Sequence, residues 1–277
     1  MKILLDYYSK IRFDLPENER SDIFLPTYML SLRLQIKKLV ALHFMIGQCD
    51  KNFDRKKSLQ PFRDIYKSAG VLREIHLEQT MLEKYATGIG LPALEFSMLE
   101  RQAVAHAQYD TFMTKKNMKA LNRHLKGLVP RLRSIRRKEV HNYLINEAKE
   151  IHHLLSQGPL NEDQIHLVRK KMKRFMFNRK SIKWENPAPC FSNDAILPKW
   201  MGIWHDHYTF MMRLNEGLGA SEIYDIERKE LTRIHAKIEV ITKAILSQIQ
   251  AILIENLGQD SLNNDPPGQL KSFHPIV

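Results

Sequence analysis

The sequence predicts an all-α protein, and two observations carry that prediction. Apolar residues recur at helical spacing along most of the chain, as in the stripe of Met29, Leu32, Ile36, Leu39 and Val40. Runs of Ile and Val are short and lie inside this helical spacing, so we find no convincing strand pattern. We therefore expect about nine or ten helices in antiparallel bundles joined by short turns.

Composition places the chain among ordinary globular proteins. It has 277 residues, of which 43% are hydrophobic and 27% are charged. Its two cysteines, Cys49 and Cys190, show no zinc-site or disulfide spacing, which favours a reduced, cytoplasmic setting. The first residues lack the apolar core of a signal peptide, and no run approaches the roughly 20 apolar residues of a membrane span. We expect an intact soluble protein.

Caps and helix breakers give the element boundaries of the first half. Residues 1–24 form a lead-in, and Pro26 opens a helix over about residues 27–48. Ser58 is predicted to cap the next helix, which Gly70 ends or kinks before helix continues to residue 85. Helical spacing resumes over residues 93–114 and 115–126.

The second half is read in the same way. Pro130 is predicted to start a long helix that ends at Leu155. Further helices are expected over about residues 162–180, 193–216 and 220–255, with a loop at 183–192. We expect one helical domain over residues 25–256, with halves at about 25–128 and 129–256, and a flexible tail over 257–277.

The positive charge is concentrated in one region of the chain. The whole sequence carries a net charge of +12, whereas residues 115–183 alone hold 19 Lys and Arg against five Asp and Glu. The rest of the chain is therefore slightly acidic. A field confined in this way attracts a polyanion to one part of the protein.

The helix that follows the cap residue Asn161 carries a basic stripe. His166, Arg169, Lys170, Lys173 and Arg174 recur at the i, i+3, i+4 spacing that usually marks a core-facing surface. Cations on one face of a helix repel one another unless anions neutralise them. A solvated basic face is the plainer interpretation. We favour a groove for a polyanion because the pattern occurs twice.

The second copy of the pattern lies in the first half of the chain. Arg33, Lys37 and Lys38 align with Arg169, Lys173 and Arg174 at an offset of 136 residues. A corner motif also repeats, at an offset of 132 residues, in which Lys67, Gly70, Arg73 and Glu74 align with Lys199, Gly202, His205 and Asp206. We therefore predict two pseudo-symmetric helical bundles with a basic groove or pore between them. Within each corner, the acid beside the base is expected to orient it or to form a local ion pair.

With these motifs together, the chain resembles a CHAD domain (conserved histidine α-helical domain) of the divergent type found in Bacteroidetes-type bacteria. The resemblance spans about residues 25–256 and rests on three groups of residues, namely His166, Arg169, Lys170, Lys173 and Arg174; Phe62, Arg63, Tyr66, Lys67, Ala69, Gly70, Arg73 and Glu74; and Gly202, Trp204, His205 and Asp206. It implies an all-α, two-bundle fold that binds inorganic polyphosphate without catalysis, without a metal or other cofactor, in the cytoplasm and at polyphosphate granules.

By position, the resemblance implies phosphate contacts in both halves. They are Arg33, Lys37, Lys38, Arg63, Lys67 and Arg73 in the first half, and His166, Arg169, Lys170, Lys173, Arg174, Lys199 and His205 in the second. The histidine that the family pattern places three residues before Arg33 is Leu30 here, which predicts weaker binding by the first half.

Other functions stay open on the sequence alone. The charge also permits RNA binding, although aromatic residues for base stacking are not interleaved with the stripes. A scaffold for an acidic protein is a further alternative. No glycine-rich phosphate loop or carboxylate cluster for magnesium indicates an enzyme, and His205, Asp206 and His207 lack a third metal ligand at helical spacing.

Overall fold

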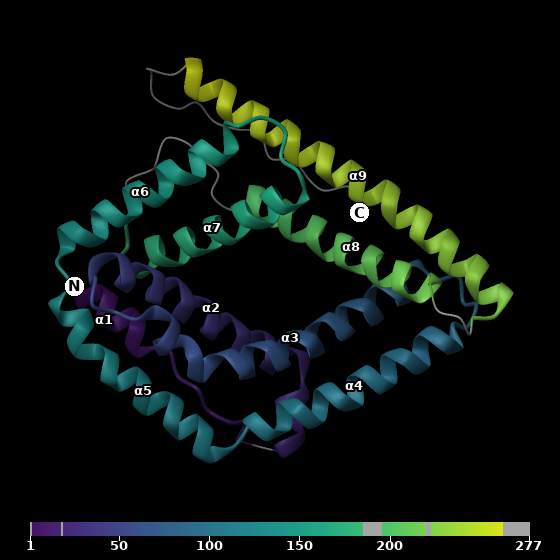
Figure 1. Ribbon diagram of the computed structural model, residues 1–277, viewed down its shortest axis with the longest axis horizontal. Helices are drawn as coiled ribbons and strands as arrows, with labels where there is room; N and C mark the ends of the chain where they lie inside the picture. The colour runs from purple at the N-terminus through teal and green to yellow at the C-terminus, as the bar shows by residue number, and fades with distance from the viewer. Residues whose placement is uncertain (1, 18, 185–195, 220–222, 263–277) are drawn as a thin grey trace.

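The computed structural model describes residues 2–17, 19–184, 196–219 and 223–262, and side chains within those ranges up to residue 254. These residues form α-helices and one short 3-10 helix, with no strand among them, which confirms the all-α prediction (Figure 1). The helices are α1 Lys2–Ser9, η1 Arg20–Phe24, α2 Pro26–Cys49, α3 Arg55–Tyr85, α4 Pro92–Phe112, α5 Lys115–Ser134, α6 Arg137–Leu155, α7 Glu162–Ser181, α8 Ile196–Leu218 and α9 Asp225–Leu262.

Helix α2 lies at the centre of the arrangement, between α7 and α3 (Figure 1). Helix α6 packs on both α7 and α2, and α4 packs on α3. Helix α8 contacts α7 and α3, and α9 packs along the length of α8. The two predicted halves of the chain therefore meet through α2 against α7 and α3 against α8.

The central position of α2 follows from how its residues are distributed around the helix. Met29, Leu32, Ile36 and Leu39 form a fully buried stripe, as the helical spacing predicts. Arg33 and Lys37 lie beside this stripe and are only partly buried. A helix buried on several sides therefore holds two cations close to the core.

Several helix starts depend on side-chain caps. Asn161 accepts a hydrogen bond from the Gln164 backbone N–H, which confirms the cap predicted for α7. Helix α4 is capped from a distant element, because the buried Glu227 carboxylate of α9 accepts hydrogen bonds from the Ala93 and Leu94 N–H groups at 3.3 and 3.0 Å. This contact ties the start of α4 to the start of α9.

Ser58 does not have the capping role that the sequence suggested. The cap of α3 is Asp54, which accepts from the Lys57 N–H, so the helix begins a turn earlier. The Ser58 hydroxyl instead lies between Nε2 of His43, at 3.0 Å, and Nε2 of His124, at 3.2 Å. Nδ1 of His43 can only donate to the Leu39 carbonyl, so its Nε2 accepts from Ser58, and His124 donates to Ser58.

Two predicted breaks are also absent. Helix α3 runs without interruption through Gly70, and α5 continues through Pro130 to Ser134 rather than ending before it. Pro130 removes one helical hydrogen bond, but Leu128 and Leu132 on either side are buried, and this packing holds the helix together.

The last helix starts later and ends later than predicted, since α9 extends from Asp225 to Leu262. The loop expected at residues 183–192 and the tail expected at 257–277 fall largely outside the described residues. Across the part of the chain that is described, no helix is both long and apolar enough to cross a membrane.

Candidate functional site

Five cationic side chains converge where α2, α3 and α7 meet. We call Arg33, Lys37, Arg73, Arg169 and Lys173 the central cluster. All five are partly buried, and the charges of Arg33, Lys173, Arg169 and Arg73 each act on the Lys37 ammonium. These residues lie up to 140 positions apart in the sequence, and helix packing brings them together.

Gly70 explains how Arg33 reaches its position. Arg33 Nη1 donates a hydrogen bond to the Tyr66 carbonyl at 2.8 Å, and the guanidinium carbon lies 4.4 Å from the centre of the Tyr66 ring. That carbonyl belongs to the residue one turn before Gly70. A Cβ on Gly70 would lie 2.6 Å from Arg33 Nη1. The absence of a side chain at Gly70 therefore lets a guanidinium approach the backbone of α3.

Arg169 lies over the second predicted glycine. A Cβ on Gly202 would lie 3.9 Å from Arg169 Nε, an ordinary van der Waals distance. The Nε atoms of Arg33 and Arg169 are both buried without a hydrogen-bond partner from the protein. Buried donors are usually satisfied, so both guanidinium groups retain capacity for an acceptor.

Electrostatics at the central cluster disfavour its own charge. Burial and, after it, the charges of the neighbouring cations together lower the pKa of Lys37 to about 8. Burial and the Arg169 charge likewise lower the pKa of Lys173. Because the positive charges of this site repel one another, the binding of an anion there is favourable.

Asp206 is the carboxylate that partly neutralises this positive charge. It accepts two hydrogen bonds from Arg73 Nη2, at 3.2 and 3.1 Å, and so joins α8 to α3. Among the described residues, no other carboxylate forms an ion pair with the central cluster. The sequence suggested that each acid would orient its neighbouring base, whereas Asp206 binds Arg73 of the other half and Glu74 lies 3.8 Å from Arg213.

Two predicted histidines border the central cluster. The rings of His166 and His205 are 4.9 Å apart between centroids. Burial and then the charge of Arg169 lower the pKa of His205 to about 4, and burial lowers that of His166. His205 is therefore neutral at pH 7 and offers a hydrogen bond rather than a positive charge.

Arg174 is engaged elsewhere. Its guanidinium donates to both carboxylate oxygens of Glu147, with distances between 2.6 and 2.9 Å, and lies 4.1 Å from the centre of the Phe44 ring. Both side chains of this pair are largely buried. We assign Arg174 to a structural ion pair between α7 and α6, contrary to its expected role as a phosphate contact.

The remaining predicted contacts lie around the central cluster rather than in it. Lys170 is exposed beside His166, and its charge acts on that ring. Lys38 is partly buried one position after Lys37 on α2, whereas Lys67 and Lys199 are exposed. Arg63 is also exposed and lines a separate hollow between α2 and α3.

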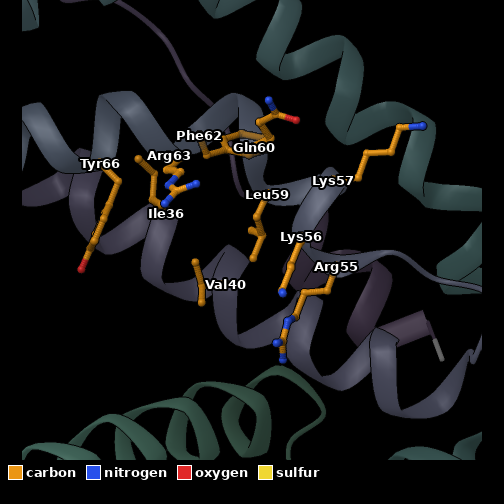
Figure 2. Close-up of a pocket in the computed structure, with 10 residues that line it drawn as sticks. All are labelled: Ile36, Val40, Arg55, Lys56, Lys57, Leu59, Gln60, Phe62, Arg63 and Tyr66. Atoms are coloured by element: carbon orange, nitrogen blue, oxygen red, sulfur yellow. The ribbon is translucent and has the colours of Figure 1, made fainter.

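This hollow, which we call the α2–α3 pocket, has a volume of about 730 Å³. Figure 2 shows its residues, with Ile36, Val40 and Leu59 in the middle and Tyr66 at one end. Arg55 and Lys56 lie toward the other end, and the Lys57 side chain points away from the rest. No sequence pattern distinguishes Arg55, Lys56 or Lys57, because they belong to a charged segment that is typical of a connection between helices.

Known proteins give no further guidance, since no family model, no curated protein and no solved structure matches this chain. Within the described residues, no group of three or more His, Cys, Asp or Glu side chains is placed to hold a metal ion. His207, the second histidine beside Asp206, is buried and bonds Tyr85 and the Ile203 carbonyl instead. The site therefore has to be interpreted from its own chemistry.

Proposed function

We propose that this protein binds inorganic polyphosphate at the central cluster and does not transform it. Five partly buried cations lie together with a single ion-paired carboxylate among the described residues, Asp206 bound to Arg73, and this excess of positive charge carries the proposal. Arg33 and Arg169 bring planar guanidinium groups that pair with two phosphate oxygens at once, and the lysines bring point charges. This is the function implied by the resemblance to CHAD domains.

The shape of the site supports a thin, flexible polyanion. Helix α2 lies between α3 and α7, and the cationic side chains lie where these three helices pack together. A single phosphate chain suits such a place, whereas a nucleic-acid duplex needs a wide exposed surface. Stacking of bases would require aromatic rings in the site, and the Tyr66 ring is already covered on one face by Arg33.

We also propose that the chain contains two related halves, α2–α3–α4 and α7–α8–α9. Arg33 of α2 lies over Gly70 of α3, and Arg169 of α7 lies over Gly202 of α8. Helix α2 packs against α7, and α3 packs against α8, as expected if a twofold axis relates the halves. The central cluster would then lie near that axis and bind one chain with residues of both halves.

Direct binding of labelled long-chain polyphosphate tests the proposal. We expect tight binding at about 50 mM salt and a loss of about 10²-fold or more at about 200 mM, the behaviour of polyanion sites with several phosphate contacts. Single-stranded RNA of equal charge should compete poorly, and phosphate release should stay at background. No binding at low salt, equal competition by RNA, or turnover would each contradict the proposal.

Binding should weaken as the pH rises through the pKa of Lys37. An anion favours the protonated lysine, so the contribution of Lys37 is present below pH 8 and lost above it. We expect the affinity for polyphosphate to fall about three- to tenfold between pH 7 and pH 9. Binding titrations at constant ionic strength measure this effect, and Lys37→Met should abolish the fall in affinity between pH 7 and pH 9. A profile that is the same in both proteins would contradict the assignment of Lys37.

The two glycines should respond differently to alanine. Gly70→Ala places a methyl group against Arg33 Nη1, so the guanidinium must leave the Tyr66 carbonyl. Gly202→Ala finds ordinary contact distances and serves as the matched control. Both glycines lie inside helices, where alanine is favoured by about 1 kcal/mol, so neither variant should unfold. We expect polyphosphate affinity to fall about tenfold for Gly70→Ala alone, from the loss of about one charge-assisted hydrogen bond.

A further inference from the structure

The α2–α3 pocket combines an aliphatic floor with a cationic rim. Ile36, Val40 and Leu59 supply the floor, and these side chains offer no hydrogen bonds. Arg55, Lys56 and Arg63 lie around it, and no carboxylate lines it. A purely inorganic anion gains nothing from the floor, whereas a purely apolar ligand gains nothing from the rim. The pocket therefore suits an anion that carries an apolar, organic part.

The rim is free to meet such a ligand. Within the described chain, none of its three cations takes part in an ion pair, although eleven such pairs are found elsewhere. Arg55 is held in place by the ring of Phe44, 3.7 Å below its guanidinium carbon. The second cation on that ring is Arg174, which Glu147 neutralises. The charge of Arg55 is left for a ligand.

The pocket adjoins the central cluster. Tyr66 lines the pocket, and its ring carries the Arg33 guanidinium of the central cluster. Ile36 of the floor directly precedes Lys37 on α2. A phosphate chain held by the central cluster is thus next to the pocket at Tyr66.

A second hollow beside the central cluster is mainly acidic. This hollow of about 360 Å³, next to His166 and His205, is lined by Glu162, Asp163 and Glu216, and by Arg213, which pairs with Glu216. A polyanion extending from the central cluster is therefore directed away from this acidic side and toward the cationic rim.

We infer that the α2–α3 pocket binds the base and ribose of a nucleoside polyphosphate whose phosphate chain occupies the central cluster. This inference rests on the proposed function and extends it to a class of organic phosphate. A flat base covers the floor on one face, and the Gln60 amide can bond its polar edge. An acyl chain, in contrast, offers no polar edge to the Gln60 amide.

Calorimetric titration with ATP and with inorganic tripolyphosphate, in magnesium-free buffer, tests the inference. Both ligands carry three phosphates, and ATP carries no more charge than tripolyphosphate, so electrostatics alone do not favour ATP. We expect ATP to bind at least about tenfold more tightly, because one face of the base is removed from water against the apolar floor. Photolabelling with 8-azido-ATP should modify the peptide that contains residues 55–66.

Val40→Asn separates the pocket from the central cluster. It keeps the size of a floor residue but removes its apolar surface, and we expect it to lower ATP affinity to that of tripolyphosphate while leaving tripolyphosphate unchanged. Val240→Asn, at an exposed valine on α9, is the matched control and should change neither. Leu59→Asn repeats the test on α3 if the first variant folds poorly.

The outcomes distinguish the inference from the proposed function. If long-chain polyphosphate binds but ATP binds no more tightly than tripolyphosphate, or if the label falls outside residues 55–66, the inference is overturned and the proposed function stands. If neither long-chain polyphosphate nor tripolyphosphate binds, the proposed function is overturned, and the inference falls with it.

Discussion

Arg169→Ala combined with Lys173→Ala should lower the affinity for long-chain polyphosphate at least about a hundredfold at low salt, because charge-assisted hydrogen bonds contribute about 1.5–3 kcal/mol each. These two residues lie one turn apart on α7 and supply two of the five central cations. Their partly buried position keeps solvent screening low, so the loss should exceed that of surface charges. Fluorescence titration with labelled polyphosphate measures the change.

The matched control removes the same charges at the same spacing. Lys119 and Arg123 lie one turn apart on the exposed face of α5, so Lys119→Ala combined with Arg123→Ala changes net charge equally. We expect this control to weaken binding less than about threefold through the general field. If both double variants lose affinity to the same extent, the binding is diffuse and the central cluster is not the site.

Lys37→Met should make the protein more stable while it weakens binding. The partly buried ammonium lies near four other cations, and methionine fills a similar volume without a charge. Allowing for solvent screening, we expect a gain of roughly 1–2 kcal/mol in the free energy of unfolding at pH 7. The affinity for polyphosphate should fall about tenfold at the same pH, from the loss of one charge-assisted contact.

The sign of the stability effect can be checked by its pH dependence. The pKa of Lys37 lies at about 8 in the folded protein, below its usual 10.5, so the folded state disfavours the charged form. The cost is present in full below pH 8 and disappears as the pH rises toward 10.5. Urea unfolding at pH 7 and pH 10 should therefore show a large gain for Lys37→Met at pH 7 and a small one at pH 10. An equal gain at both would attribute the effect to packing instead.

Lys38→Met provides the matched comparison for this substitution. Lys38 is the next residue on α2 and is also partly buried, but it does not lie among the central cations. We expect little change in stability at either pH. A gain equal to that of Lys37→Met would show that the extra apolar surface, and not the removed charge, stabilises the fold.

The sequence alone determined the helical class of this protein and much of its local structure. Helical spacing of apolar residues decides which faces are buried, and Met29, Leu32, Ile36 and Leu39 on α2 are buried accordingly. Capping is also a local property, so the start of α7 at Asn161 was readable in advance. The same local reasoning predicts that Gly70 ends or kinks a helix and that Pro130 starts one, whereas α3 continues through Gly70 and α5 through Pro130, because packing of neighbouring buried residues outweighs a single unfavourable position.

Only the tertiary structure decided which of the predicted cations lie together. The sequence places Arg169 and Arg174 on one basic stripe, yet Arg169 joins the central cluster while Arg174 is bound by Glu147 of α6. The tertiary structure also pairs Asp206 with Arg73, 133 residues away, rather than with its neighbour His205. Spacing along a helix gives the direction of a side chain, but the partner that meets it there comes from another helix, and charge neutralisation depends on that partner.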